Sequence, residues 1–303
     1  MLLQGMLDAR SHYARGKCLG GSSARNFLTY QRGSKDAYNR WANLVGDQDY
    51  SWNRFLPYFE KSLDFTPPDN SNRPANATPQ YDTSTLGNGN GPLSVTFARY
   101  AMAFSSWAQL ALTRMGLRSL KGLTSGDIMG SSYQLLTLNA TNMIRESSET
   151  AFLVKNGLPR SNLIVYQSTL AKKIVFDGTT ATGVVIDMEG ILFTLSAKKE
   201  VIVSAGAFQS PQLLMVSGVG PAATLQKFNI PVVADRPGVG QNMLDHILGG
   251  PSYRVNVITT SALGNPLFAA QAAQQFNDYA SGILTDVGAD FLGMSFSLSF
   301  GCY

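Results

Sequence analysis

The chain has 303 residues, of which 44% are apolar and 15% are charged, a composition typical of a globular protein and not of a disordered or fibrous one. Its net charge of +4 is not gathered in any dense run of Lys and Arg, which argues against a nucleic-acid partner, and no apolar run is long enough to span a bilayer. Two cysteines, Cys18 and Cys302, are too few for a disulfide framework, and no metal site is predicted.

The first informative stretch is glycine-rich and reads Gly16-Lys17-Cys18-Leu19-Gly20-Gly21-Ser22-Ser23-Ala24-Arg25-Asn26. Because glycine has no Cβ, backbone N–H groups here can come close to a bulky anionic or planar ligand. Two hydroxyls and an amide follow and supply further donors. Ordinary turns use the same residues. Taken alone, the stretch leaves a ligand-binding loop and a plain turn both open.

Two helices are predicted between residues 35 and 59, where aromatic and apolar positions recur at helical spacing. A polar break over residues 47–51 separates them, with Ser51 suited to cap the second helix. Prolines, asparagines and glycines then predict a long surface loop over residues 64–92. Its glycine cluster, Gly87 to Gly91, is followed by no helix, which favours a turn over a dinucleotide-binding loop.

Further along, helices and strands are predicted to alternate. A helix is expected over residues 104–115, with Gly116 as its stop, and another is expected to begin within residues 145–153. Five runs rich in β-branched and apolar residues predict strands, of which Val201-Ile202-Val203 is typical of a buried one. These runs are residues 163–167, 173–176, 182–187, 192–196 and 200–204.

After the last of these strands, a short helix is predicted from its end signals. Ser210 and Pro211 suit the N-cap and first helical position, and Gly218 suits the residue past the end. A final helix is expected over residues 269–279. The strand, glycine turn and helix together could point a helix N-terminus at a ligand.

Three blocks of sequence, in the same order, resemble the GMC (glucose-methanol-choline) flavin oxidoreductases. The first runs from Arg15 to Gly33, with Trp41 beyond it, although the family has an aliphatic residue at the position of Arg25. The second runs from Ser204 to Pro221, and the third from Val239 to His246. The resemblance covers most of residues 10–250 and fades at both ends.

This resemblance implies an α/β fold with an FAD/NAD(P)-binding Rossmann-like domain and a smaller α+β substrate-binding domain built on an antiparallel sheet. The FAD-binding domain is expected to be discontinuous, over residues 1–62 and 141–250, and the substrate-binding domain to occupy residues 63–140 and 251–303. No G-x-G-x-x-G unit precedes Gly16, and the family's catalytic region is not matched, so both domains are expected to be incomplete.

By the same resemblance, FAD is the expected cofactor and five residues are expected near it. Ser22, Asn26, Phe27 and Thr29 fall where the family places residues around the flavin, and the backbone of Ala171 is expected at the adenine end. The alternative, in which these residues only build turns and strands, stays open.

No catalytic residue is assigned. In the family, a C-terminal histidine with a histidine or asparagine partner removes the alcohol proton, which requires a base that is effective near neutral pH. His12 and His246 are the only histidines, and neither matches that position. His246 is interpreted as structural or adjacent to the cofactor.

The implied function is FAD-dependent oxidation of the CH–OH group of a small-molecule alcohol, with oxygen or a quinone as electron acceptor. One alternative is a lyase or cyclase whose flavin is redox-silent, and another is a non-catalytic truncated remnant. The 303 residues by themselves are expected to be inactive and to hold no flavin. No nucleic-acid or membrane partner is expected. Localisation is left open: secretion would require a signal peptide in a longer product, and only then would the sequons at Asn76 and Asn139 matter.

Overall fold

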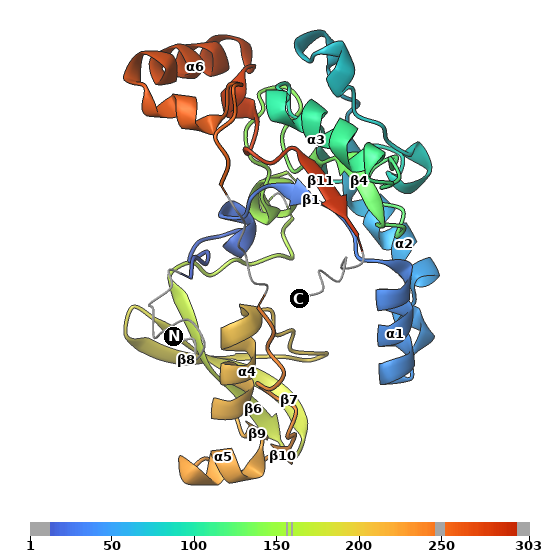
Figure 1. Ribbon diagram of the computed structural model, residues 1–303. Helices are drawn as coiled ribbons and strands as arrows, with labels where there is room; N and C mark the ends of the chain where they lie inside the picture. The colour runs from blue at the N-terminus through green and yellow to red at the C-terminus, as the bar shows by residue number, and fades with distance from the viewer. Residues whose placement is uncertain (1–12, 156, 159, 246–251, 296–303) are drawn as a thin grey trace. The chain divides into compact units, whose positions relative to one another are not determined.

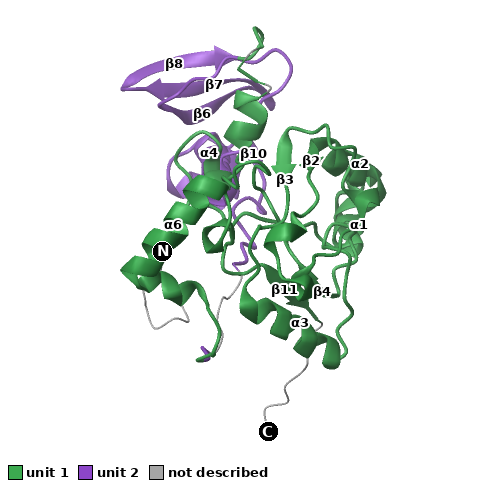
Figure 2. Cartoon of the chain, turned by 90° about the horizontal axis from the view of Figure 1, so that it is seen from above, with its two compact units in different colours: residues 1–163, 254–303 green, residues 164–253 purple. Residues whose placement is uncertain are grey.

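The computed structural model describes residues 13–155, 157–158, 160–245 and 252–295. They belong to two compact units, of which unit 1 comprises residues 1–163 and 254–303 and unit 2 comprises residues 164–253 (Figure 2). The predicted FAD-binding and substrate-binding domains were defined by the ligand that each would bind, whereas these units are defined by how compactly the chain packs. The predicted division therefore stays a prediction. Among the described residues, no helix combines the length and apolar character needed to cross a membrane.

The described residues of unit 1 form four α-helices, and the sequence predicted all of them. They are α1 (Lys35–Val45), α2 (Trp52–Ser62), α3 (Ala103–Arg114) and α6 (Pro266–Tyr279). Ser51 stands at the N-cap of α2 as predicted, and Gly116 follows α3 with a φ of 91°. At α6, the Asn265 side chain accepts hydrogen bonds from the N–H groups of Leu267 and Phe268, which are among the donors that a helix start leaves unpaired.

The strands of unit 1 are short and form pairs. β1 (Thr29–Tyr30) is antiparallel to β5 (Leu135–Leu136), β2 (Leu63–Phe65) is parallel to β3 (Leu93–Val95), and β4 (Gly130–Tyr133) is antiparallel to β11 (Phe291–Met294). Figure 1 shows β11 beside β4, which brings together the two sequence segments assigned to the substrate-binding domain. The buried core packs Leu63, Val95, Phe97, Tyr133 and Leu135 around these pairs.

The loop over residues 64–92 contains three 3-10 turns, η3 (Asn70–Asn72), η4 (Ala75–Ala77) and η5 (Thr83–Thr85). Its glycine cluster forms a turn against the end of α2, as predicted. A Cβ on Gly87 would lie 2.3 Å from the carbonyl oxygen of Glu60, and one on Gly91 would lie 2.3 Å from the backbone nitrogen of Leu63. Glycine is therefore needed here for close backbone approach, and no ligand is needed to explain it.

Other helical turns of unit 1 are also short. They include the 3-10 turns η2 (Gln48–Tyr50), η7 (Thr260–Gly264) and η8 (Ile283–Thr285), and the π-helical segment η6 (Glu149–Val154). The helix expected to begin within residues 145–153 therefore exists only as η6, which starts at Glu149.

The described part of unit 2 combines a three-stranded antiparallel sheet with two helices. The sheet has the order β6 (Thr169–Asp177), β7 (Thr180–Met188) and β8 (Ile191–Ser196). Beside it are α4 (Gly206–Val216), α5 (Ala222–Lys227) and a parallel pair of short strands, β9 (Val219–Gly220) and β10 (Ala234–Asp235). The predicted strands at 173–176, 182–187 and 192–196 are confirmed, and Gly178, with a φ of 57°, lies in the turn between β6 and β7.

Two predicted strands and one predicted helix start are wrong. Residues 163–167 and 200–204 form no strand, and 77% of Ile202 is exposed where a buried strand was expected. β-Branched residues favour an extended backbone, but a strand also needs a neighbouring strand to pair with. Neither run pairs with another strand among the described residues. Helix α4 begins at Gly206, with Ala205 at its N-cap, so Pro211 lies inside the helix.

Ser217 ties the sheet of unit 2 to the end of α4. Its hydroxyl accepts a hydrogen bond from the N–H of Ile174 on β6 (2.8 Å) and donates one to the carbonyl oxygen of Leu213 (2.6 Å), and the residue is only 2% exposed. We expect S217A to destabilise unit 2 by about 1.5 kcal/mol, because a buried N–H loses its acceptor. Amide hydrogen exchange at Ile174 should become faster, whereas the exchange of α1 amides in unit 1 should be unchanged.

Candidate cofactor-binding site

The glycine-rich stretch forms a tight loop that ends in a single 3-10 turn, η1 (Gly21–Ala24). Gly20 has a φ of +83°, and a Cβ there would lie 3.2 Å from both Glu149 Cβ and Ser147 Oγ. Gly21 also has a positive φ, of +55°, with open space where a Cβ would project. A side chain is disfavoured at Gly20 by both conformation and crowding, so the loop lies close against the start of η6.

Two serines hold this loop in place. Ser23 Oγ donates to the carbonyl oxygen of Gly20 (2.5 Å) and accepts from the backbone N–H of Ser148 (2.9 Å). Ser148 Oγ donates to the same Gly20 carbonyl (2.9 Å). The loop is thereby attached, through side chains and backbone, to a segment more than a hundred residues later in the chain.

Three of the five predicted cofactor-binding residues lie within four positions at the end of the loop. Asn26 Oδ1 accepts from Leu28 N (3.0 Å) and from Arg145 Nη1 (2.6 Å). Phe27 is 81% exposed, an unusual position for a phenyl ring. Thr29 lies in β1, paired with Leu136, with its hydroxyl 3.5 Å from the carbonyl oxygen of Phe27.

The fourth residue of this group, Ser22, lies within η1 and is exposed. Its hydroxyl accepts a long hydrogen bond from the N–H of Gly16 (3.4 Å). The structure therefore places Ser22, Asn26 and Phe27 on the exposed surface of one short segment of unit 1, and half-buried Thr29 directly after them.

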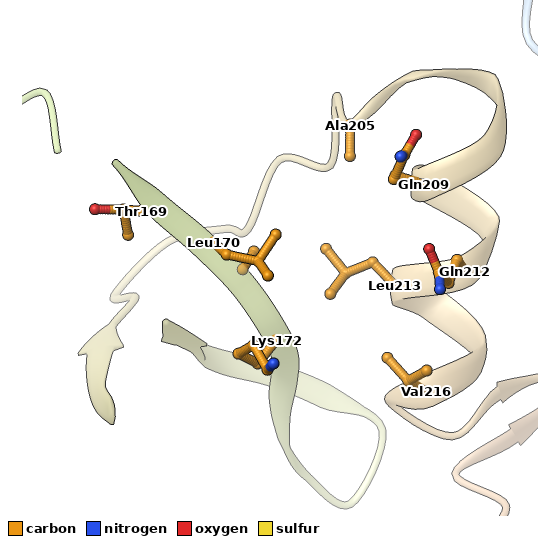
Figure 3. Close-up of a pocket in the computed structure, with 9 residues that line it drawn as sticks. Thr169, Leu170, Lys172, Ala205, Gln209, Gln212, Leu213 and Val216 are labelled. Carbon is orange, nitrogen blue, oxygen red and sulfur yellow. The ribbon is translucent and has the colours of Figure 1, made fainter. Parts of the chain in front are cut away.

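Ala171, the fifth predicted residue, lines a cavity inside unit 2. The cavity has a volume of about 550 Å³ and lies between the start of β6 and one face of α4, from Gln209 to Val216. In Figure 3, Leu170 of the strand and Leu213 of the helix point toward one another across it. The register of β6 shifts between Ala171 and Lys173, which is the signature of a β-bulge. Bulges redirect side chains and are frequent beside binding sites.

Each of these two regions, taken by itself, has chemistry that suits a part of FAD. The loop of unit 1 offers an exposed aromatic ring, an amide and glycine backbone that can closely approach a planar or anionic group. The cavity of unit 2 has a largely aliphatic wall, with the Gln209 and Gln212 amides at its edge, and its volume is within the range of small-molecule pockets. The residues present therefore fit the cofactor.

The described residues hold no group of three or more His, Cys, Asp or Glu side chains that could bind a metal ion. Both histidines, His12 and His246, and the cysteine Cys302 lie outside the described residues, so the interpretation of His246 stays a prediction.

A buried cluster of ionisable side chains lies in unit 1 around Arg73, Asp286 and Asp290. Burial and the neighbouring Asp290 raise the pKa of Asp286 to about 7, and burial also raises the pKa of Asp290. Perturbed carboxyl groups often mark active sites. Here Asp290 is bound by Arg73, Ser105 and the backbone of Met102, which is the environment of a structural ion pair.

Comparison with known proteins decides the family. The family model described as GMC oxidoreductase matches residues 3–248. The chain belongs to this family. It is 60% identical over 288 residues to the patulin synthase of Penicillium expansum, a match that covers 95% of this chain and 46% of the relative.

Solved structures agree. An FAD-dependent oxidoreductase from Chaetomium thermophilum is 28% identical with a TM-score of 0.86, over 96% of this chain and 50% of that one. A fungal aryl-alcohol oxidase is 27% identical with a TM-score of 0.81, over 91% of this chain and 48% of that one. The predicted family, fold class and FAD cofactor are thereby confirmed, and the chain spans about half the length of the relatives that it matches.

Sequence reasoning missed two residues of the site, Arg145 and Ser148. It predicted only that a helix begins within residues 145–153 and gave these two residues no role. Their partners, Asn26 and Ser23, lie 119 and 125 positions away in sequence, and no local pattern encodes such contacts.

Proposed function

We propose that the protein containing this chain oxidises a small-molecule alcohol at a CH–OH group, with FAD as its cofactor. The family match over residues 3–248, together with an exposed, pre-formed glycine loop, carries the proposal. A likeness to an aryl-alcohol oxidase supports an alcohol as the substrate. Which alcohol is the substrate is a question for the experiment described below.

The residues of this chain would bind and orient the cofactor. Asn26 would donate from its amide, Phe27 would pack its exposed ring against the flavin, and Ser22 and Thr29 would offer hydroxyls. The backbone at Ala171 would meet the adenine end. The chemistry supplied by bound FAD is acceptance of hydride from the alcohol carbon, followed by return of the electrons to oxygen or a quinone.

The two predicted domains are part of this proposal. Residues 1–62 and 141–250 would hold FAD, and residues 63–140 and 251–303 would contact the alcohol. The pairing of β4 with β11 supports the second assignment, because it joins residues from both of those sequence segments.

The test is an anaerobic titration of the complete gene product, loaded with FAD, with a panel of primary, secondary and aryl alcohols. We expect at least one alcohol to bleach the visible absorption band of oxidised flavin, and admission of oxygen or a quinone to restore it. Product formation with the band unchanged would instead establish a lyase or cyclase. A complete product that binds no FAD would support the non-catalytic alternative.

A further inference from the structure

We propose that Arg145 is a positioning residue that fixes the orientation of the Asn26 amide, so that the amide meets the cofactor with its Nδ2 donor. The inference rests on the proposed function, since it assigns a role within the same FAD site. Arg145 contacts the Asn26 side chain, which is proposed to bind FAD, and does not itself contact the reacting atoms.

Both acceptor positions of the Asn26 carbonyl oxygen are occupied. Oδ1 accepts from Arg145 Nη1 at 2.6 Å and from Leu28 N at 3.0 Å. An amide oxygen has two lone pairs, and an amide nitrogen has two hydrogens. Among the described residues, none accepts a hydrogen bond from Asn26 Nδ2, and the Asn26 side chain is exposed. The group left to meet a ligand is therefore a donor.

Arg145 is itself held firmly. Its Nη1 also donates to the carbonyl oxygen of Ser23 (3.3 Å), so the same atom contacts both ends of the turn that carries Asn26. Its backbone forms a bridge with Leu138, and the following residue, buried Glu146, donates its N–H to the carbonyl of Thr137 (2.9 Å). The backbone that carries the Arg145 side chain is therefore held in place by these hydrogen bonds.

The backbone at Leu28 gives independent support. Leu28 has a φ of 65°, a conformation that is costly for a residue with a branched side chain. Its carbonyl oxygen accepts from both the N–H and the hydroxyl of Thr137 (2.8 and 3.1 Å), which holds the residue in that conformation. Arg145 and Thr137 thus both hold the turn through hydrogen bonds. The strained backbone at Leu28 places its N–H where it donates to Asn26 Oδ1, which helps to fix the orientation of the amide.

The chemical consequence concerns acceptor groups of FAD. The flavin ring carbonyls, the ring nitrogens that carry neither hydrogen nor substituent and the diphosphate oxygens all accept hydrogen bonds, so a donor that faces one of them is favourable. Without Arg145, the amide could turn over and present Oδ1 to an acceptor, which is repulsive. The residue therefore acts on cofactor binding through Asn26.

A double-mutant cycle on FAD affinity tests the inference, with dissociation constants measured by quenching of flavin fluorescence in the complete gene product. R145M and N26L should each weaken FAD binding about tenfold, and the double variant should also weaken it only about tenfold. R145K should stay within about threefold of the wild type, because a single nitrogen, Nη1, makes both contacts and an ammonium group can replace it.

R118M serves as the matched control, since Arg118 pairs with Asp127 at the exposed surface of unit 1 and should leave FAD affinity unchanged. N26D keeps both bonds to the side-chain oxygen and replaces the donor with a second, negatively charged oxygen, so it should weaken FAD binding at least about tenfold without lowering the melting temperature. This variant keeps the test valid if R145M fails to fold.

A roughly hundredfold loss in the double variant would overturn the inference, because it would mean that Arg145 binds FAD directly. Unchanged affinity in N26D would overturn it as well. Failure of the wild-type protein to bind FAD would instead refute the proposed function, and the inference with it.

Discussion

Replacing Arg73 with methionine is expected to lower the free energy of unfolding of unit 1 by about 4 kcal/mol. The Arg73 and Asp290 side chains are only 1% and 2% exposed, and Arg73 Nη2 lies 3.8 Å from Asp290 Oδ2. Removing one member of such a buried pair leaves the other charge without its partner in a poorly hydrated environment. The cost is therefore far larger than that of losing a surface ion pair.

The Arg73 guanidinium also satisfies backbone groups that no water could easily reach. Nε donates to the carbonyl oxygen of Ala77 (3.0 Å), and Nη1 donates to those of Ala98 (2.7 Å) and Tyr100 (3.0 Å). Its charge lies 4.9 Å from the centre of the Tyr133 ring, at cation–π distance. One side chain thus connects the loop after α2, the segment before α3 and the residue that precedes β11.

Urea unfolding followed by tryptophan fluorescence measures this effect in unit 1 alone, because the three tryptophans are Trp41, Trp52 and Trp107 and all lie in that unit. R118M, which breaks an exposed Arg–Asp pair, should change the free energy of unfolding by no more than about 0.5 kcal/mol. Adding D290N to R73M should recover part of the loss, because the uncompensated charge is then gone. Equal effects of R73M and R118M would show that the cluster has no structural role.

The sequence predicted the elements whose signals are local. The helices α1, α2, α3 and α6 follow apolar periodicity and end signals such as Ser51 and Gly116, all contained within a few residues. The β6–β7 hairpin follows from two β-branched runs joined by a glycine turn. The start of α4 was misplaced because Pro211 favours a first turn without requiring one. Residues 201–203 failed as a strand because pairing depends on a partner elsewhere.

The candidate site was predictable only in part, for the same reason. Resemblance to a family gave Ser22, Asn26, Phe27, Thr29 and Ala171 as residues near FAD, and these roles stay predictions. Arg145 and Ser148 reach the loop through contacts that span more than a hundred residues, which a single sequence does not reveal. The hydrogen bonds show how the loop is held, and neither composition nor spacing could supply that information.

Replacing Asp286 with asparagine is expected to stabilise unit 1 at alkaline pH by about 4 kcal/mol and to leave it unchanged near pH 4. Asp286 Oδ1 accepts from Gly288 N (2.6 Å), whereas Oδ2 is buried with no hydrogen-bond partner among the described residues. Burial and the charge of Asp290 raise the pKa of Asp286 to about 7. An asparagine keeps the Oδ1 acceptor and places a neutral donor where the unpaired oxygen lies.

The sign follows from proton binding. An unfolded Asp has a pKa of about 3.9, so between about pH 4 and about pH 7 the folded state holds a proton that the unfolded state has released. The free energy of unfolding of the wild type should therefore fall as pH rises through this window, and stay level above it as far as Asp286 is concerned. D286N should lack this decline, and tryptophan-monitored urea unfolding of both proteins across the window measures the difference.

D290N provides the contrasting control. It removes the negative charge that faces Arg73 and leaves one oxygen in place of the two that accept from Ser105 and Met102 N, so it should destabilise unit 1 throughout the range. It should also flatten the decline with pH, because the pKa of Asp286 loses the contribution of a neighbouring negative charge. If D286N and the wild type showed parallel curves, Asp286 would not be the titrating group. If D290N were as stabilising as D286N, the two carboxyl groups would have the same role, and the distinction drawn from Arg73 would be wrong.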